Sequence, residues 1–272
     1  MVRFMKQLTN RSVADEFALD ATGPDTWQAR VDRTWRGWTG PHGGALAALL
    51  VEVARRATGD ELPVRAVDMR FLGRPVDGAF TFSATPQPIG RSTAVVDVVA
   101  RQESGPVAAA SITLGRTAPS SVPDRTDRPA PEVAAADSCA AFRLPPEIVP
   151  VGAHFDIRPA AGPLPLTAAA EAWMCAWIAL DPPMATDAAA LAILADALPP
   201  GIFPTLSAPI AVPTVAFSMH VHTDFTAPAS QPVLVRAANT GTGGGWSVDD
   251  IDIWDEPGRL LVSARQTRRV LG

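Results

Sequence analysis

The two halves of the 272-residue chain repeat the same order of elements. Each half has an Ala- and Leu-rich stretch with helical spacing of its apolar residues, followed by three runs of strand-forming residues. The helical stretches cover 43–57 and 186–198, and the strand-like runs cover 64–76, 79–90 and 93–116 in the first half and 213–225, 232–244 and 246–271 in the second. When Met69 is aligned on Met219 and Gly105 on Gly258, both halves are in step, which indicates a duplication.

A helix followed by a meander of long antiparallel strands forms an α+β unit in which the sheet can wrap the helix. The apolar residues of each helical stretch recur at spacings of three and four, the pattern of a buried stripe. They are Leu46, Leu49, Leu50 and Val53 in the first stretch and Leu191, Leu194 and Leu198 in the second. We therefore expect each helix to be the core of its own sheet.

A segment rich in Pro, Ser and charged residues lies between the halves, in the stretch RTAPSSVPDRTDRPAPEVAAAD. Few of its residues are large and apolar, which is typical of a surface connector. The sequence thus predicts a first repeat at 1–116, a linker at 117–145 and a second repeat at 146–272.

Charge and composition exclude several classes of protein. The net charge of −5 leaves no diffuse basic surface for nucleic acid or an anionic membrane. No run approaches the roughly 20 apolar residues of a membrane span, and the first residues lack a signal peptide's apolar stretch, so we expect a cytoplasmic protein. Cys139 and Cys175 lack metal-ligand spacing, and we expect both to be buried and reduced. His220 and His222 share one strand face but have no third ligand at suitable spacing, so no metal is predicted.

The stretch GPHGGALAALL, followed much later by ALAILADALPPGIFPTL, PTVAFSMHVHTDF and DEPGRLLVSARQ, resembles the TesB-like (type II) acyl-CoA thioesterases. The resemblance covers about residues 25 to 270, including the order and spacing of both repeats. It implies a double hotdog fold and the hydrolysis of a fatty-acyl-CoA, or a related acyl thioester, to free acid and thiol. It implies no cofactor beyond the coenzyme A of the substrate.

In that family an aspartate, a threonine or serine, and a glutamine position the attacking water, and the matching residues here are Asp196, Thr214 and Gln266. A carboxylate can accept the proton of water, while hydroxyl and amide groups can hold the water in place. Relatives carry an Asp-His pair just after the threonine, where this chain has Ala216 and Phe217.

The internal repeat allows the functional role of these three residues to be tested without another sequence, because each can be compared with its equivalent in the first half. The first-half positions that match Asp196, Thr214 and Gln266 fall at or next to Val51, Val64 and Thr113. A carboxylate in an otherwise apolar helix is costly to bury unless something pairs with it or uses it. The competing interpretation is that these three are ordinary solvated residues.

The His42-Gly43-Gly44 start of the first helix leaves backbone N–H groups open to a ligand. We expect Gly43 and Gly44 to supply a donor to the thioester oxygen, opposite the water held by Asp196; the alternative is a tight turn with His42 as a helix cap or core residue. Arg268 is a candidate for pairing with the phosphates of coenzyme A, as are Arg91, Arg158, Arg265 and Arg269. Glu52 is a second candidate acid, expected to be a solvated helix residue.

Two other functions are compatible with this fold. A catalytically silent acyl-CoA binder or sensor would bind the thioester without cleaving it. A hydratase or dehydratase would need an Asp-His pair in the active repeat, and Ala216 and Phe217 argue against one. The duplication supplies the pairing of two hotdog units within one chain, so a monomer is sufficient and a homo-oligomer is possible.

Overall fold

The computed structural model describes residues 11–271 except 60–61, 89, 144 and 224–230. The strands of the first half are β1 (Asp20–Gly23), β2 (Thr26–Val31), β3 (Val64–Phe71), β4 (Gly78–Pro88), β5 (Thr93–Gln102) and β6 (Gly105–Gly115). Those of the second half are β7 (Phe155–Ala161), β8 (Trp173–Leu180), β9 (Thr214–Val221), β10 (Val233–Gly243), β11 (Trp246–Trp254) and β12 (Leu260–Arg269). The α-helices are α2 (Val13–Glu16), α3 (Gly43–Ala57) and α4 (Ala188–Leu194), and the 3₁₀ helices are η1 (Arg33–Trp35), η2 (Ala136–Ser138), η3 (Pro150–His154) and η4 (Phe203–Thr205).

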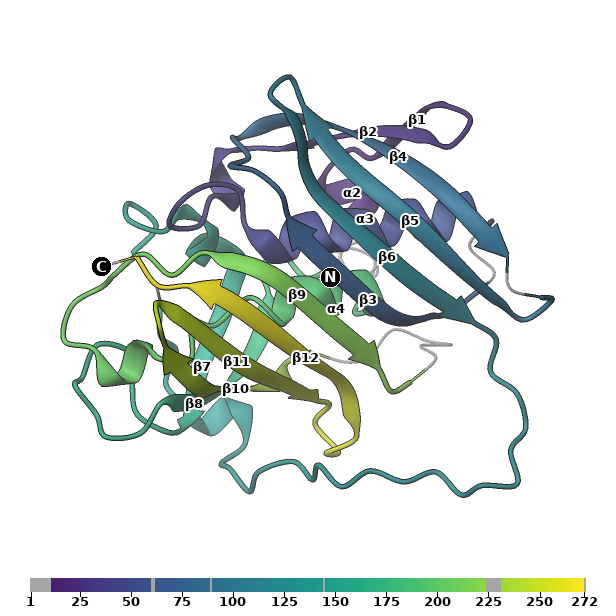
Figure 1. Ribbon diagram of the computed structural model, residues 1–272. Coiled ribbons are helices and arrows are strands. Elements are labelled where there is room, and N and C mark those ends of the chain that lie inside the picture. Colours follow the sequence, from purple (N-terminus) through teal and green to yellow (C-terminus); the bar gives the residue numbers. More distant parts are fainter. Residues whose placement is uncertain (1–10, 60–61, 89, 144, 224–230, 272) are drawn as a thin grey trace, which may run out of the picture.

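All these strands join one twelve-stranded antiparallel sheet, in the order β1-β2-β4-β5-β6-β3-β9-β12-β11-β10-β8-β7. The repeats meet where β3 pairs with β9, side by side at the middle of the sheet (Figure 1). Val67 lies opposite Met219 and Met69 opposite Phe217, so a pseudo-twofold axis passes between Asp68 and Ser218. The predicted duplication and the alignment of Met69 on Met219 are confirmed.

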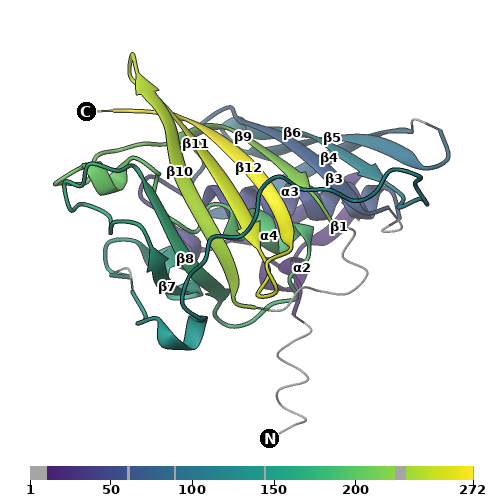
Figure 2. The same cartoon turned by 90° about the horizontal axis from the view of Figure 1, so that it is seen from below.

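Helices α3 and α4 lie within the curve of this sheet and pack against each other (Figure 2). Residues of both helices and both halves of the sheet belong to one continuous apolar core. The expectation of a separate core for each repeat is therefore wrong, because the sheet does not close around either helix alone.

The two helices differ in length although their sequences are alike. Helix α3 runs for four turns and ends before Gly59, whose φ of +79° suits a residue without a side chain. Helix α4 ends at Leu194, four residues earlier than predicted. Pro199 and Pro200 follow, and a proline restricts the residue before it to extended backbone. Asp196 therefore lies just beyond the helix rather than on its face.

Residues 128–139 of the predicted linker 117–145 pack against the outer face of the second repeat, whereas the residues before them form a loop that stands away from it (Figure 1). The indole Nε1 of Trp177 donates to the Ala134 carbonyl at 2.8 Å, and that of Trp254 donates to the Arg128 carbonyl at 2.9 Å. Arg128 also pairs with Asp252 at 2.7 Å. The segment is thus part of the second repeat's packing as well as a connector.

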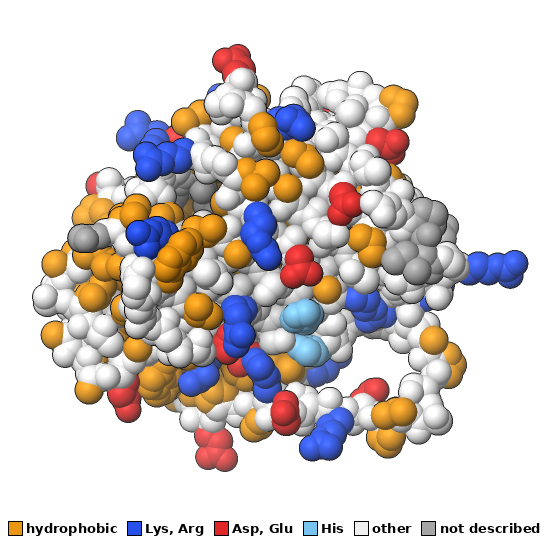
Figure 3. Space-filling model, in the orientation of Figure 1, with side chains coloured by type: hydrophobic (Ala, Val, Ile, Leu, Met, Phe, Trp, Pro, Cys, Tyr) orange, Lys and Arg blue, Asp and Glu red, His pale blue; other side chains and the backbone are white. Residues whose placement is uncertain are grey.

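Elsewhere the outer face of the sheet is polar, and Figure 3 shows charged and histidine side chains gathered over it. Arg265 pairs there with Asp250 at 2.6 Å, and His222 lies 2.9 Å from the Ser263 hydroxyl. Among the described residues no group of three His, Cys, Asp or Glu side chains is placed to hold a metal ion. No helix in the described ranges is long and apolar enough to cross a membrane.

The cysteines have different surroundings. Cys175 is buried, and burial raises the pKa of its thiol to about 11, so it stays protonated at neutral pH. Cys139 is only half-buried, since it lies on the segment that crosses the outer face of the sheet. The expectation that both are buried therefore holds for Cys175 alone.

Candidate active site

The start of α3 and the end of α4 meet around the carboxylate of Asp196. The N–H of Gly44 donates to Oδ2 at 2.9 Å, and the amide Nε2 of Gln266 donates to Oδ1 at 3.0 Å. The Nε2 atom of His42 lies 2.9 Å from the backbone carbonyl of Asp196 and 3.4 Å from its Oδ2. Because a carbonyl only accepts hydrogen bonds, this His42 nitrogen carries a proton. The carboxylate is therefore held by groups from both repeats.

Two strands of the second repeat supply the remaining polar groups. Thr214 begins β9, and its hydroxyl donates to Oε1 of Gln266 on β12 at 2.8 Å. Arg268, two residues further along β12, donates from Nη1 to the same hydroxyl at 2.9 Å and lies 3.5 Å from Oδ1 of Asp196. The three residues implied by the family resemblance, Asp196, Thr214 and Gln266, thus lie in one hydrogen-bonded network.

The strand pairing corrects the repeat alignment by one residue at this point. Gln266 lies opposite Phe217, and the equivalent of Phe217 is Val67, which lies opposite Ile112. The first-repeat equivalent of Gln266 is therefore Ile112, the neighbour of Thr113. The shift arises because the loop before β12 is longer than the two-residue turn before β6.

The two glycines at the start of α3 have different roles. A Cβ on Gly44 would lie 2.7 Å from the Ala192 carbonyl oxygen, so its absence lets α3 and α4 approach. A Cβ on Gly43 would lie 3.0 Å from both Oδ2 of Asp196 and the Phe71 ring, beside the cavity. Because the Gly44 N–H is bound to Asp196, Gly43 is the better candidate for a free donor. His42 is buried and makes no capping bond to the helix.

A cavity of about 400 Å³ opens beside this network. Its polar lining includes the network residues Asp196, Thr214 and Arg268, together with His42 and Gly43. The rest of the wall is largely apolar and includes Trp38, Phe71, Val149, Leu198, Phe203 and Val212. A concave, mostly apolar site with a few converging polar groups is the usual form of a small-molecule site.

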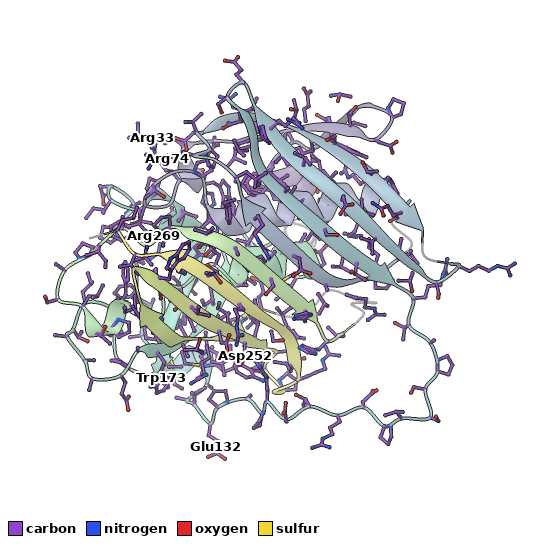
Figure 4. The ribbon with its side chains drawn as sticks, viewed as in Figure 1. Arg33, Arg74, Glu132, Trp173, Asp252 and Arg269 are labelled. Carbon is purple, nitrogen blue, oxygen red and sulfur yellow. The ribbon has the colours of Figure 1, made fainter. Side chains whose placement is uncertain are left out.

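The candidate arginines are mostly engaged elsewhere. Arg268 is 7% exposed, and its Nε donates to Oδ2 of Asp249 at 2.9 Å, so it faces the network and not the solvent. Arg269, at the end of β12, lies over the Trp246 ring, 5.3 Å from its centroid (Figure 4). Arg158 and Arg265 pair with Asp156 and Asp250, and Arg91 is exposed in the turn between β4 and β5.

Sequence reasoning missed two residues of this region. Asp249 on β11 is almost fully buried and contacts Arg268; the strict alternation of a strand gives the only signal for it, since Asp249 and Asp250 must face opposite sides. Arg74 is exposed and lines the cavity (Figure 4). It lies in the loop after β3, where sequence patterning does not report the direction of a side chain.

Two further expectations change. Glu52 is buried and pairs with Arg55 at 2.8 Å, so it is not the solvated residue expected. Phe217 fills the core from β9, as expected for a strand without the Asp-His pair of relatives. An Asp-His contact nevertheless exists, between Asp196 and His42 of the other repeat, so the absence of a pair on β9 does not exclude hydratase chemistry.

Comparisons with known proteins agree with this fold. The model of the acyl-CoA thioesterase N-terminal domain matches residues 31–115, and that of the acyl-CoA thioesterase C-terminal domain matches residues 119–270. The chain therefore belongs to the acyl-CoA thioesterase family, with one thioesterase domain in each half. The comparison with curated proteins gave no match.

Three solved structures share the fold over almost their full length. A hot dog fold protein of unknown function from Alicyclobacillus acidocaldarius is 23% identical, with 97% of this chain and 99% of that chain covered and a TM-score of 0.86. A structure described as a putative thioesterase II from Thermobifida fusca is 21% identical, with 97% and 98% covered and a TM-score of 0.80. The acyl-CoA thioesterase II TesB2 from Mycobacterium marinum is 17% identical, with 96% and 98% covered and a TM-score of 0.73.

Proposed function

We propose that this protein hydrolyses an acyl-CoA, or a related acyl thioester, to the free acid and the thiol. The observation that carries the proposal is that Asp196 and Thr214 line a largely apolar cavity and are joined behind it by Gln266, which hydrogen-bonds to both. The family provides the substrate class. The apolar wall suits the acyl chain, and the exposed Arg74 at the cavity suits a phosphate of coenzyme A.

The hydrogen bonds support a specific position for the attacking water. The Thr214 proton is used in the bond to Gln266, so toward water this hydroxyl presents only a lone pair. Water can then donate one hydrogen to Thr214 and the other to the Asp196 carboxylate. In this orientation a lone pair of the water oxygen points toward the thioester carbonyl. Gln266 orients these two groups, and Asp196 acts as the general base.

The reaction needs no covalent intermediate. Asp196 takes a proton as the water oxygen bonds to the carbonyl carbon, and negative charge develops on the carbonyl oxygen. The N–H of Gly43, which makes no hydrogen bond within the described part of the chain, is the donor we assign to that oxygen. The C–S bond then breaks, and the thiolate takes up the proton held by Asp196.

The test is thiol release from a series of acyl-CoAs, short to long and branched, by wild type and by Asp196→Asn. The variant keeps the shape of the side chain, so we expect melting temperature and acyl-CoA binding to be retained and turnover to fall about 10²- to 10⁴-fold. Asp250→Asn, on the outer face of the sheet, is the matched control and should behave as wild type. Tight binding without turnover by the wild type would instead indicate a silent binder or sensor.

The contact between His42 and Asp196 favours one second candidate, the addition of water to a 2-enoyl thioester. That reaction needs two groups to move protons, and a histidine beside a carboxylate can supply both. A 2-enoyl-CoA in the same substrate series separates the two reactions. Loss of the enoyl absorbance without release of thiol would indicate hydration.

A further inference from the structure

The hydrogen bonds around Asp196 all donate in one direction, from Arg268 through Thr214 and Gln266 to the carboxylate. A guanidinium can only donate hydrogen bonds, so the Thr214 oxygen accepts from Arg268 and its own proton must go to Oε1 of Gln266. The amide of Gln266 then presents its NH₂ group to Asp196, which only accepts while it is ionised. Arg268 stands at the head of this chain and sets the orientation of each later group.

Arg268 is itself held from behind by Asp249. This carboxylate is 1% exposed and accepts from Nε of Arg268 at 2.9 Å, from the Gly201 N–H at 3.1 Å and from Nδ2 of Asn239 at 3.0 Å. Asp249 does not line the cavity, so a ligand there does not reach it. Its bond to Gly201 also fixes the loop that carries Pro199 and Pro200 in the cavity wall.

Burial argues against a phosphate-binding role for Arg268. All three of its nitrogens face acceptors of the protein, and the guanidinium already has one carboxylate at 2.9 Å and a second at 3.5 Å. Binding of a phosphate would require it to leave Asp249 buried without a counter-charge, which is strongly unfavourable. An arginine that binds coenzyme A is expected at the exposed rim, as Arg74 is.

We propose that the buried ion pair Asp249–Arg268 is a positioning pair, which fixes the direction of the Thr214–Gln266–Asp196 chain and does not contact the substrate's phosphates. The proposal rests on the hydrolytic function proposed above. Asp249 and Arg268 act through other residues, so they are positioning residues and Asp196 remains the catalytic base. Without the pair the Thr214 hydroxyl can turn, and the Gln266 amide can flip with it.

The experiment compares Asp249→Asn, Arg268→Gln and the double variant with Asp250→Asn and Arg265→Gln. The control pair Asp250–Arg265 lies on the same two strands, on the opposite face. For each variant the kcat and KM for thiol release and the melting temperature are measured. We expect kcat to fall by up to about 100-fold in both single variants with little change in KM, since misplacement of reacting groups lowers the rate of the chemical step. The double variant should lose no more than the worse single variant, because the pair acts as a unit.

Three outcomes would overturn the proposal. A raised KM with unchanged kcat in Arg268→Gln would make this arginine a substrate contact, and wild-type kcat in Asp249→Asn would show that its anchor is not needed. Absence of thiol release by the wild type would overturn the proposed function and this inference together, which distinguishes that failure from the other two. If Arg268→Gln does not fold, Arg268→Lys takes its place: it keeps the charge, but its donors radiate from one nitrogen and cannot reach acceptors that Arg268 contacts with three separate nitrogens, so its kcat should still fall.

Discussion

The two repeats share one fold but differ at every position of the candidate site. The second repeat has Asp196, Thr214, Gln266, Asp249 and Arg268 where the first has Val51, Val64, Ile112, Val96 and Leu114, all five of them buried. The pair Thr214–Arg268 is hydrogen-bonded across two strands, and its equivalent Val64–Leu114 is an apolar contact at the same register. One of the two symmetry-related positions is polar, and the other is ordinary core.

The helix starts differ in the complementary sense. Helix α4 is capped by Asp187, which accepts from the N–H groups of Ala189 and Ala190. Helix α3 has no side-chain cap, and its Gly44 N–H instead binds Asp196 of the other repeat. The first N–H groups of α4 are therefore bound within its own repeat, whereas those of α3 are available to a functional group. The duplication thus provides the backbone scaffold for two symmetry-related sites, but the side chains of the two repeats complete only one of them.

The largest effect is expected from Val51→Asp, which places a carboxylate at the first-repeat equivalent of Asp196. No equivalent of Gln266 or Arg268 is present there, since Ile112 and Leu114 occupy those positions. A buried charge without partners costs about 3–5 kcal/mol, so the free energy of unfolding should fall by that amount in urea titrations followed by tryptophan fluorescence. The loss should be larger at pH 8 than at pH 5, because burial raises the pKa of the folded carboxyl and stability falls as pH rises from the pKa of the unfolded carboxyl toward this raised one.

Val51→Thr is the control, since a hydroxyl can bond to the preceding turn of the helix and should cost far less. Equal stability of the two variants would mean that the first-repeat position holds partners for a charge, and the contrast between the repeats would lose its physical basis.

A smaller effect separates the two glycines at the start of α3, whose equivalents at the start of α4 are Ala188 and Ala189. Gly44→Ala puts a methyl group 2.7 Å from the Ala192 carbonyl oxygen, and overpacking of this kind costs about 1–3 kcal/mol. Gly43→Ala meets only the Asp196 carboxylate and the edge of Phe71 at 3.0 Å, so we expect turnover to fall while the melting temperature changes little. Melting curves and thiol release of both variants test this, and equal losses of turnover and stability at Gly43 would remove it from the site.

The sequence predicts the duplication, and it predicts that the first-repeat equivalents of Asp196 and Thr214 are apolar, because both signals are local. Spacing within each run predicts the strands, and Met69 and Met219 identify β3 and β9 as equivalent strands, although their pairing with each other is visible only in the structure. The alternation of side chains along β12 also places Gln266 and Arg268 on the same face of the sheet. This favours a role of Arg268 in the network around Asp196 over binding of the coenzyme A phosphates.

The other features of the fold and site depend on contacts between residues that are far apart in the sequence. Sequence does not report that the two helices share one core, that α4 ends early enough to direct Asp196 at the Gly44 N–H, or that Asp249 backs Arg268. The strands that precede the helices, β1, β2, β7 and β8, are not predicted either, although β2 alternates buried and exposed residues, because the repeat is recognisable only in the elements that follow each helix.

The smallest expected effect concerns the linker, which packs on the outer face of the second repeat. Trp254→Phe removes the hydrogen bond to the Arg128 carbonyl but keeps an aromatic ring at a position that is 2% exposed. The loss of one such bond costs about 0.5–1.5 kcal/mol, and urea unfolding should show a change of that size with unaltered turnover. Trp246→Phe, at a ring that is 43% exposed, is the control and should change stability less. A fall in turnover in Trp254→Phe at unchanged stability would connect the linker to the site, and the contrast between the repeats would then extend beyond the cavity to the outer face of the sheet.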